Sequence, residues 1–196
     1  MRIIQPTDDH LHDAARQIYA QDITNVLLPE TESDLVHAIN ASLQQGTYLT
    51  VQGGRTGLGN GAVPTTKSII LDMSQMLTSI IPEGFEPIIS NLPQGTLNWG
   101  LDRETNQAVF PPGVTLDQVD EVIRPYNLRL SVNPTCGSAQ LGGAFSTGAS
   151  GSRSFMFGSI DDAVKRARVI LPTGKTVDLT RGQQTSSGPN LNLRTT

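Results

Sequence analysis

The 196-residue sequence has one cysteine, few aromatic side chains and no long apolar run. The single cysteine, Cys136, excludes a disulfide within the chain. No run of eighteen apolar residues occurs, so we expect no transmembrane helix. The formal net charge of −4 lacks the basic excess of nucleic-acid binders, and we expect no nucleic-acid partner. The first residues lack the apolar core of a signal peptide, and we therefore expect a cytoplasmic protein.

Glycine, in contrast, is abundant, and five glycines fall within the nine residues from Gly53 to Gly61. Apolar runs at 48–51 and 67–72 flank this segment, and both predict strands. Because glycine has no side chain, an anion can reach the backbone N–H groups, whose dipoles then replace its water. The pattern predicts a phosphate-binding loop between two strands. A surface loop without a ligand is the alternative.

Two common phosphate-binding loops do not fit this segment. A Walker A loop ends in Gly-Lys-Ser/Thr, and no lysine directly follows these glycines. A dinucleotide-binding Rossmann loop has the pattern G-x-G-x-x-G and opens a helix, whereas the spacing from Gly57 to Gly61 differs and a strand follows. The loop therefore belongs to a third kind.

A second block of small residues spans 133–151, and three shorter motifs lie at 110–116, 158–164 and 169–175. Together with the glycine loop, in the same order, these motifs resemble the PCMH-type FAD-binding domain of vanillyl-alcohol oxidase and of the FAD-linked D-lactate and glycolate dehydrogenases. The loop from Gly53 through Pro64 resembles the pyrophosphate loop of that family.

The resemblance implies an α+β fold with FAD in the cleft between two small subdomains, residues 1–75 and 76–196, the first carrying the pyrophosphate loop at 53–64. The residues expected to contact FAD are mostly small and come from the two blocks and the shorter motifs. They are Gly53, Gly54, Arg55, Thr56, Gly57, Asn60, Gly61, Ala62, Gly113, Pro134, Thr135, Cys136, Gly137, Ser138, Leu141, Gly142, Gly143, Ser146, Asp162 and Val169. On this interpretation, Gly54→Val abolishes FAD retention and leaves the fold largely intact.

Several positions depart from the family pattern or allow more than one role. Gln52 stands where Arg is common, and Arg55 stands where a third Gly is common; its side chain faces either the phosphates or solvent. Thr56 occupies the position of the histidine that some members link to FAD, so the resemblance implies non-covalent FAD. Cys136 either packs near the isoalloxazine, forms a thioether with it, or is a plain buried thiol. Asp162 lies near the flavin or caps a turn.

Local signals predict the secondary structure. Thr31 with Asp34 and then Gly46 bound a helix over 32–45, a second helix spans 115–123, and a short helix lies near 8–20. We expect a surface insertion at 95–100, which contains Trp99, and core positions for the tyrosines. The histidines are expected to be neutral and remote from the glycine loops. The predicted strands are 24–28, 48–52, 68–72, 86–91, 129–132 and 164–171, the last paired with 176–179.

The resemblance implies hydride transfer from a small 2-hydroxy acid, similar to lactate or glycolate, to FAD, followed by electron transfer to an acceptor. No residue is identified as the catalytic base, and no metal site is predicted. Residues 180–196 are polar, and we expect the substrate-binding cap domain of the family to be absent from this chain. Two alternatives remain open: a MurB-like reductase that uses NADPH, and a degenerate binding module without catalytic activity.

Overall fold

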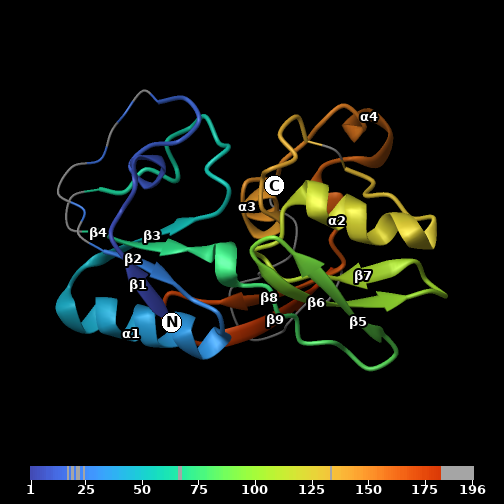
Figure 1. The fold of residues 1–196 in the computed structure, drawn as a ribbon, viewed down its shortest axis with the longest axis horizontal. Coiled ribbons are helices and arrows are strands. Elements are labelled where there is room, and N and C mark those ends of the chain that lie inside the picture. Colours follow the sequence, from blue (N-terminus) through green and yellow to red (C-terminus); the bar gives the residue numbers. More distant parts are fainter. Residues whose placement is uncertain are drawn as a thin grey trace.

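The structure is a computed structural model that describes residues 1–16, 18, 20, 23, 25–65, 68–132 and 134–181. The described residues form three sheets, of which a four-stranded and a three-stranded one lie side by side, each with its own helix, and the third is a two-stranded hairpin (Figure 1). The strands are β1 (Arg2–Ile4), β2 (Val26–Leu28), β3 (Tyr48–Gln52), β4 (Ser68–Asp72), β5 (Glu86–Leu92), β6 (Gly95–Asp102), β7 (Gln107–Val109), β8 (Arg166–Ile170) and β9 (Thr176–Thr180). The helices are α1 (Glu32–Gln45), α2 (Leu116–Ile123), α3 (Leu141–Ser146), α4 (Ser154–Phe157) and α5 (Ile160–Ala163), with 3₁₀ turns η1 (Asp8–His10), η2 (Met73–Gln75) and η3 (Arg124–Tyr126).

The first sheet has the strand order β1-β2-β4-β3, in which β2, β4 and β3 run parallel and β1 is antiparallel. Helix α1 covers one face, where Ala38 packs with Leu27 and Leu71. The other face is covered by irregular segments, with Val63 packed against a core that includes Val26 and Ile70. The glycine-rich segment therefore lies over a packed face of this sheet.

The connection between β3 and β4 confirms the predicted strand–loop–strand arrangement. The two strands are parallel neighbours, paired from Tyr48 with Ser68 to Gln52 with Asp72. A parallel connection needs a crossover, usually a helix, and here the long loop from 53 to 67 serves instead. The loop leaves the sheet where β3 and β4 both have their carboxyl ends, which is where ligands bind in open α/β sheets.

Capping residues define α1 and confirm the helix predicted over 32–45. The Thr31 hydroxyl accepts the Asp34 N–H at 3.2 Å, and Asp34 Oδ2 accepts the backbone N–H groups of Glu30 at 3.0 Å and of Thr31 at 3.1 Å. These bonds, first that of Glu30, lower the pKa of Asp34 to about 2 despite partial desolvation. Gly46 ends the helix with φ 62°. Helix α2, predicted over 115–123, has the same type of cap at Thr115.

The second sheet, β5-β6-β7, is antiparallel and packs on α2. Its central strand buries Leu97, Trp99 and Leu101. Trp99 is 0% exposed, and its ring stacks on Phe110 with centroids 4.9 Å apart. The predicted surface insertion at 95–100 is therefore wrong. Alternation of Leu97, Trp99 and Leu101 is the period of a half-buried strand, but the intervening glycine and asparagine concealed it.

Other predictions also need correction. Among the described residues of the helix predicted near 8–20, only the 3₁₀ turn η1 forms, and no strand forms at 129–132, although Val132 is buried. Tyr48 was expected in the core but is 69% exposed on the edge strand β3. Tyr19 lies outside the described residues. Strands β1, β6 and β7 and the short helices α3, α4 and α5 were not predicted, because each is short or rich in glycine.

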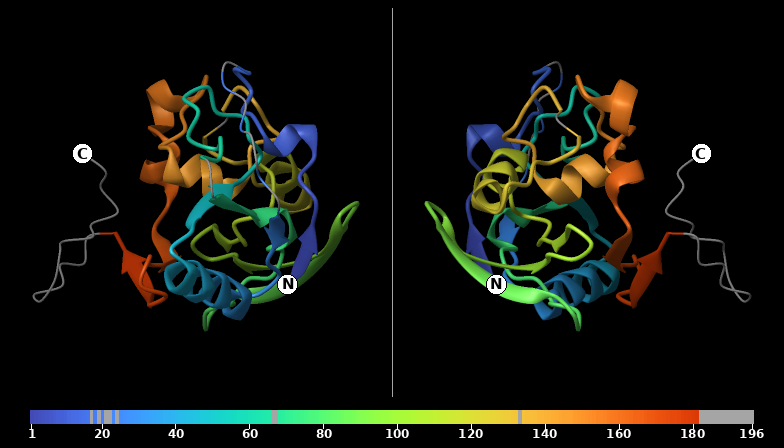
Figure 2. Two further views of the ribbon diagram at one scale, coloured as in Figure 1. Left: turned by 90° about the vertical axis from the view of Figure 1, so that its left-hand side faces the viewer. Right: turned by 90° about the vertical axis from the view of Figure 1, so that its right-hand side faces the viewer.

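The predicted hairpin near the end of the described chain is confirmed as β8–β9. It lies beside α1 rather than in the second sheet (Figure 2). The Arg168 guanidinium forms two bonds to the Glu32 carboxylate, of 2.6 and 3.1 Å, and Gly174 faces the Asn40 side chain. Among the described residues no helix combines the length and hydropathy that crossing a membrane requires.

Candidate cofactor-binding site

The two glycine-rich blocks, far apart in the sequence, meet in space. A Cβ placed on Gly54 would lie 3.2 Å from Ala139 Cα and closer still to the Ser138 carbonyl oxygen. A Cβ on Gly53 would lie 3.6 Å from Gly143 Cα. At Gly54 the two backbones touch and no space for a side chain remains, whereas a Cβ on Gly53 would only make ordinary van der Waals contacts. We call Gly53 and Gly54 the packed half of the loop.

This contact overturns one expectation from the sequence. Gly54→Val was expected to fill phosphate space and leave the fold largely intact. The space beside Gly54 is instead occupied by the Ser138 and Ala139 backbone, so a larger residue must push the two blocks apart. The glycine is required by packing whether or not a ligand is bound.

Gly113 and Gly142, also expected at the cofactor, take part in similar close packing. A Cβ on Gly113 would lie 2.8 Å from the Met76 carbonyl oxygen, and one on Gly142 would lie 2.7 Å from Pro112 Cβ. The Gly142 N–H donates to the Pro112 carbonyl at 3.0 Å, which joins this segment to α3. Close packing at Gly113 and Gly142 thus holds the second block against the segments around Met76 and Pro112.

The rest of the loop is different. Around Gly57, Gly59 and Gly61, no atom of the described residues lies within 4 Å of the position that a Cβ would take. All three are exposed, so their backbone is accessible. We call the segment from Gly57 to Gly61 the open half of the loop. Among the described residues of the loop, these three glycines leave space beside the backbone that a ligand could enter.

The N-terminal segment, residues 7–15, forms hydrogen bonds with the loop. The Ala14 N–H donates to the Gly57 carbonyl at 3.2 Å, and the Asn60 N–H donates to Asp13 Oδ2 at 2.6 Å. Asp13 is almost completely buried. The Asn60 N–H, predicted to contact phosphate, therefore already has an internal carboxylate as its partner. Sequence reasoning did not identify Asp13, whose distance in sequence from the loop hides this contact.

Gln52 connects the same segment to both ends of the loop. Its Nε2 donates to the carbonyl oxygens of His10 at 2.8 Å and of Ala62 at 2.7 Å. The side chain is fully buried. Gln52, which stands where Arg is common, thus places an amide inside the protein, and the two N–H bonds of its Nε2 donate to two backbone carbonyls.

Arg55 faces neither of the two directions expected from the sequence. Its Nη1 donates to Asp72 Oδ2 at 3.1 Å, and His10 Nε2 lies 3.1 Å from the same oxygen. Burial raises the pKa of Asp72, but bonds from Ser74 and the Arg55 charge outweigh it, so the pKa is lowered. His10, expected to be remote from the glycine loops, lies at the base of this loop.

Three buried side-chain oxygens near the junction have no hydrogen-bond partner among the described residues. They are Gln52 Oε1, Asn60 Oδ1 and Gln140 Oε1. Gln140 Oε1 is 3.5 Å from the position of a Cβ on Gly53, where the blocks meet. An unpaired buried acceptor costs about 1–3 kcal/mol. Such acceptors are suited to a ligand with hydroxyl or N–H donors, or to bound water.

The second block places its predicted contacts at different depths. Cys136 is exposed, with Sγ 3.1 Å from Ser138 Oγ, so the buried-thiol interpretation is wrong. Thr135 is exposed as well, and Leu141 and Gly143 are half-buried, as are Pro134 and Thr56. Ser146 Oγ donates to the Gly142 carbonyl at 2.8 Å, within α3.

Two predicted residues have structural partners of their own. Asp162 caps α5, accepting the Ser159 N–H at 2.9 Å, and pairs with Arg181 at 3.0 Å. The bond from Arg181, followed by that of Ser159, lowers the pKa of Asp162. Val169 pairs with Val177 in the β8–β9 hairpin. The structure thus supports the capping role for Asp162.

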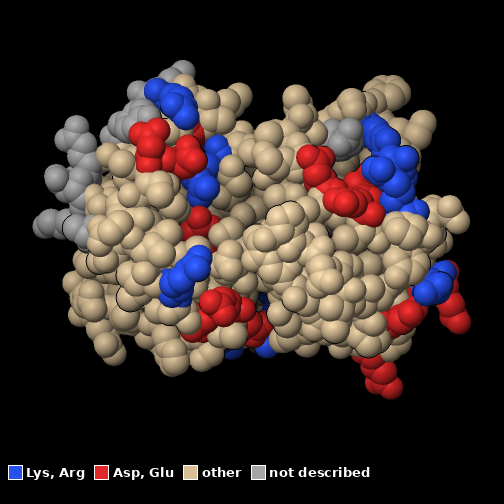
Figure 3. All heavy atoms as spheres, viewed as in Figure 1, with Lys and Arg blue, Asp and Glu red and all other residues tan. Residues whose placement is uncertain are grey.

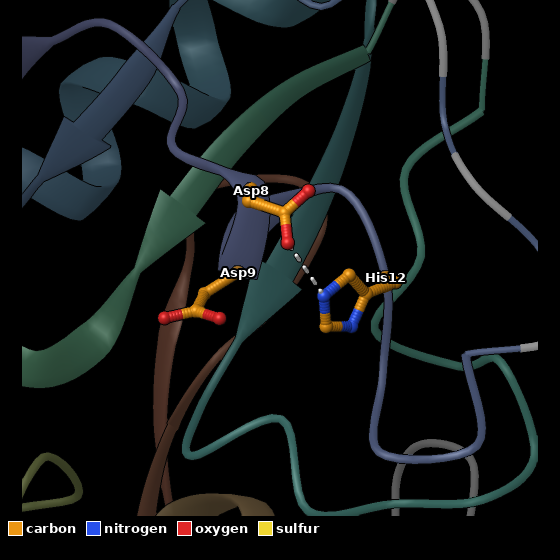
Figure 4. Close-up of side chains that lie close together, drawn as sticks. All are labelled: Asp8, Asp9 and His12. Carbon is orange, nitrogen blue, oxygen red and sulfur yellow. Dashed lines mark ion pairs between the residues drawn. The ribbon is translucent and has the colours of Figure 1, made fainter.

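One group of metal-type donors occurs among the described residues, at Asp8, Asp9 and His12 (Figure 4). Their ligand atoms lie within 4.8 Å of one another. His12 Nε2 is 3.4 Å from Asp8 Oδ2, and its Nδ1 lies 2.8 Å from the Asp13 carbonyl oxygen. Both carboxylates are exposed, and both nitrogens of the His12 ring already have partners within the protein.

On the face drawn in Figure 3, acidic and basic side chains are intermixed.

Comparison with known proteins defines the class of this domain. A family model described as an FAD binding domain matches residues 95–180. The fold is similar to 6-hydroxy-D-nicotine oxidase of Arthrobacter nicotinovorans, with TM-score 0.70 and 16% identity over 91% of this chain and 35% of that one. Alkyldihydroxyacetonephosphate synthase aligns with TM-score 0.66 and 18% identity, over 84% and 27%. The predicted PCMH-type FAD-binding fold is confirmed, and the match to the FAD binding domain supports FAD as its cofactor.

The curated relatives include several dehydrogenases of small hydroxy acids. D-lactate dehydrogenase of Archaeoglobus fulgidus is 22% identical over 91% of this chain and 37% of its own length. D-lactate dehydrogenase of Anaerostipes hadrus is 27% identical over 94% and 35%. D-2-hydroxyglutarate dehydrogenase of Escherichia coli is 26% identical over 78% and 14%. The chain thus spans little more than a third of these relatives, or less.

Proposed function

We propose that this chain is the FAD-binding part of an oxidoreductase that oxidises a small 2-hydroxy acid. The observation that carries the proposal is the meeting of the two glycine-rich blocks beside an open backbone segment. Similarity to D-lactate and D-2-hydroxyglutarate dehydrogenases supports the substrate class. Residues 1–75 and 76–196 would form the two subdomains on either side of the cofactor.

FAD fits the residues that are present. In the proposal, the open half of the loop and Ala62 hold the pyrophosphate through backbone N–H groups, because the loop's own cation, Arg55, is already paired with Asp72. Gln140, whose Oε1 lacks a partner among the described residues, accepts a hydroxyl or N–H donor of the cofactor. The small residues from Pro134 to Ser138 line the cleft on the other side.

When bound, FAD would supply the redox chemistry, which is acceptance of a hydride from the C–H bond of the hydroxy acid. The protein's own residues would bind and orient the cofactor, and the glycines, which have no side chain, would leave room for its phosphates. We assign no catalytic base among the described residues, and in the proposal another residue of the oxidoreductase takes the proton of the substrate hydroxyl. An electron acceptor would then reoxidise the flavin.

We propose non-covalent binding, since Thr56 cannot replace a histidine link. Absorbance between 300 and 550 nm, recorded on the purified and desalted chain after adding FAD, tests this. Twin flavin bands that move to the supernatant after acid precipitation support the proposal, whereas bands that remain in the pellet point to a thioether at Cys136. Absence of bands under all conditions favours a degenerate module.

A second measurement separates the two catalytic alternatives. Anaerobic addition of D-lactate or D-2-hydroxyglutarate to the complete oxidoreductase of the proposal is expected to bleach the flavin bands. Bleaching by NADPH, without any effect of the hydroxy acids, favours the MurB-like reductase instead.

A further inference from the structure

Arg55 adopts a backbone conformation that a side chain makes unfavourable. Its φ is 54°, in the left-handed region, although glycines surround it in the loop. A residue with a Cβ is less stable in this region than in the right-handed one, because its Cβ approaches the carbonyl oxygen that follows. Glycine at this position would avoid that cost. The Arg55 side chain therefore needs a compensating interaction, and the structure shows one.

The compensating group is the Asp72 carboxylate. Oδ2 takes the Arg55 Nη1 donor at 3.1 Å and lies 3.1 Å from His10 Nε2, and Oδ1 accepts the Ser74 N–H at 2.9 Å. Asp72 is 5% exposed, so the carboxylate has exchanged its water for these donors. A buried carboxylate is tolerated only when it is paired in this way.

The protonation of His10 follows from its other partner. The Thr7 N–H donates to His10 Nδ1 at 3.0 Å, so Nδ1 is an acceptor without a hydrogen. The hydrogen of the neutral ring is therefore on Nε2, which donates it to Asp72. Neutral histidine, carboxylate and guanidinium together carry no net charge.

The network lies where the loop begins. Asp72 and Gln52 are register partners at the ends of β4 and β3. The backbone carbonyl of His10 accepts from Gln52, which also holds Ala62 near the far end of the loop. The loop, its two flanking strands and the N-terminal segment are thus connected through one cluster of buried polar contacts.

We infer that Arg55, Asp72 and His10 form a positioning network that fixes the phosphate-binding loop before the cofactor binds. The inference rests on the proposed function for its effect on FAD. Ordering a backbone costs conformational entropy, and a loop that is already fixed avoids this cost on binding. Arg55 therefore supports affinity by holding the loop, not by contacting phosphate.

The test is a double-mutant cycle on the 196-residue chain, with Arg55→Met, Asp72→Asn and the double variant. Asn keeps an oxygen for the Ser74 N–H. The control is Arg103→Met, which removes an exposed Arg–carboxylate pair with Glu86 in the second sheet. The readouts are the FAD dissociation constant, from flavin fluorescence, and amide hydrogen exchange of residues 53–61 without flavin.

We expect each single variant to weaken FAD binding roughly tenfold and to speed amide exchange in the loop. The double variant should be about as weak as either single one, because both remove the same contact. Arg55→Lys, which keeps the charge, should recover part of the affinity, and Arg103→Met should change neither readout.

Additive effects on FAD affinity, or unchanged exchange in both single variants, would overturn the inference. A uniform rise in exchange over the whole chain, with lower stability to urea, would also overturn it, since that shows a general structural role. If the parent chain binds no FAD, the proposed function fails, and loop exchange alone then decides whether the network positions the loop.

Discussion

The two halves of the glycine loop use the same residue for opposite purposes. Around Gly54, backbone atoms fill the space of a side chain, whereas around Gly57 no atom of the described residues lies within 4 Å of it. The first half needs glycine so that two distant blocks can touch, and the second half leaves its backbone open to a ligand. Glycine content alone predicts a special loop but does not say which glycines pack and which bind.

The largest difference between the halves should appear in stability. Gly54→Ala is expected to lower the free energy of unfolding by about 3 kcal/mol, because the Ser138 and Ala139 backbone must move. Gly57→Ala should change it by less than about 0.5 kcal/mol. Urea denaturation of both variants measures this directly, and equal losses would contradict the division into halves.

A second pair tests whether backbone neighbours are what makes a glycine irreplaceable. The atoms nearest to a Cβ on Gly113 are the carbonyl oxygens of Met73 and Met76, whereas those nearest to one on Gly137 belong to the Asp117 carboxylate. Gly113→Ala should therefore cost about 2–3 kcal/mol, and Gly137→Ala about 1 kcal/mol.

The Asp117 carboxylate can rotate away, so adding Asp117→Ala should remove the cost of Gly137→Ala but leave that of Gly113→Ala unchanged. Thermal unfolding of the two double variants provides the comparison. Rescue of Gly113→Ala by Asp117→Ala would show that the two sites are not independent.

Acid should weaken the support of the loop without any direct effect on the open half. The pKa of Asp72 is lowered in the folded protein, so its contribution to stability is present above the usual pKa of 3.8 and is lost as the pH falls through the lowered value. The free energy of unfolding should therefore fall more steeply below pH 3.8 in the parent chain than in Asp72→Asn. Identical slopes would show that Asp72 is not stabilised as an anion.

Much of the fold could be predicted from the sequence where local signals are strong. The Thr31 and Thr115 caps and Gly46 define two helices correctly, and the glycine loop was correctly placed between β3 and β4. Strand β6 was not predicted because glycine and asparagine stand between its buried apolar residues. Its side chains are buried by packing against α2 and Phe110, and local composition does not show this packing.

Within the site, the sequence identified the two blocks but not their contacts. The roles of Asp13, His10 and Gln140 depend on residues far away in the chain, and no spacing rule connects them with the loop. The direction of Arg55 likewise required the position of Asp72, which only the parallel pairing of β3 and β4 provides.

The most direct test of a cofactor-binding open half is a flavin fluorescence titration of the parent chain, Gly57→Ala and Gly59→Ala. FAD affinity is expected to fall at least about tenfold in both variants, since a methyl group would occupy the space of the phosphates, while unfolding by urea stays unchanged. Parent-like FAD affinity in both variants would contradict the assignment of this segment as the phosphate-binding surface.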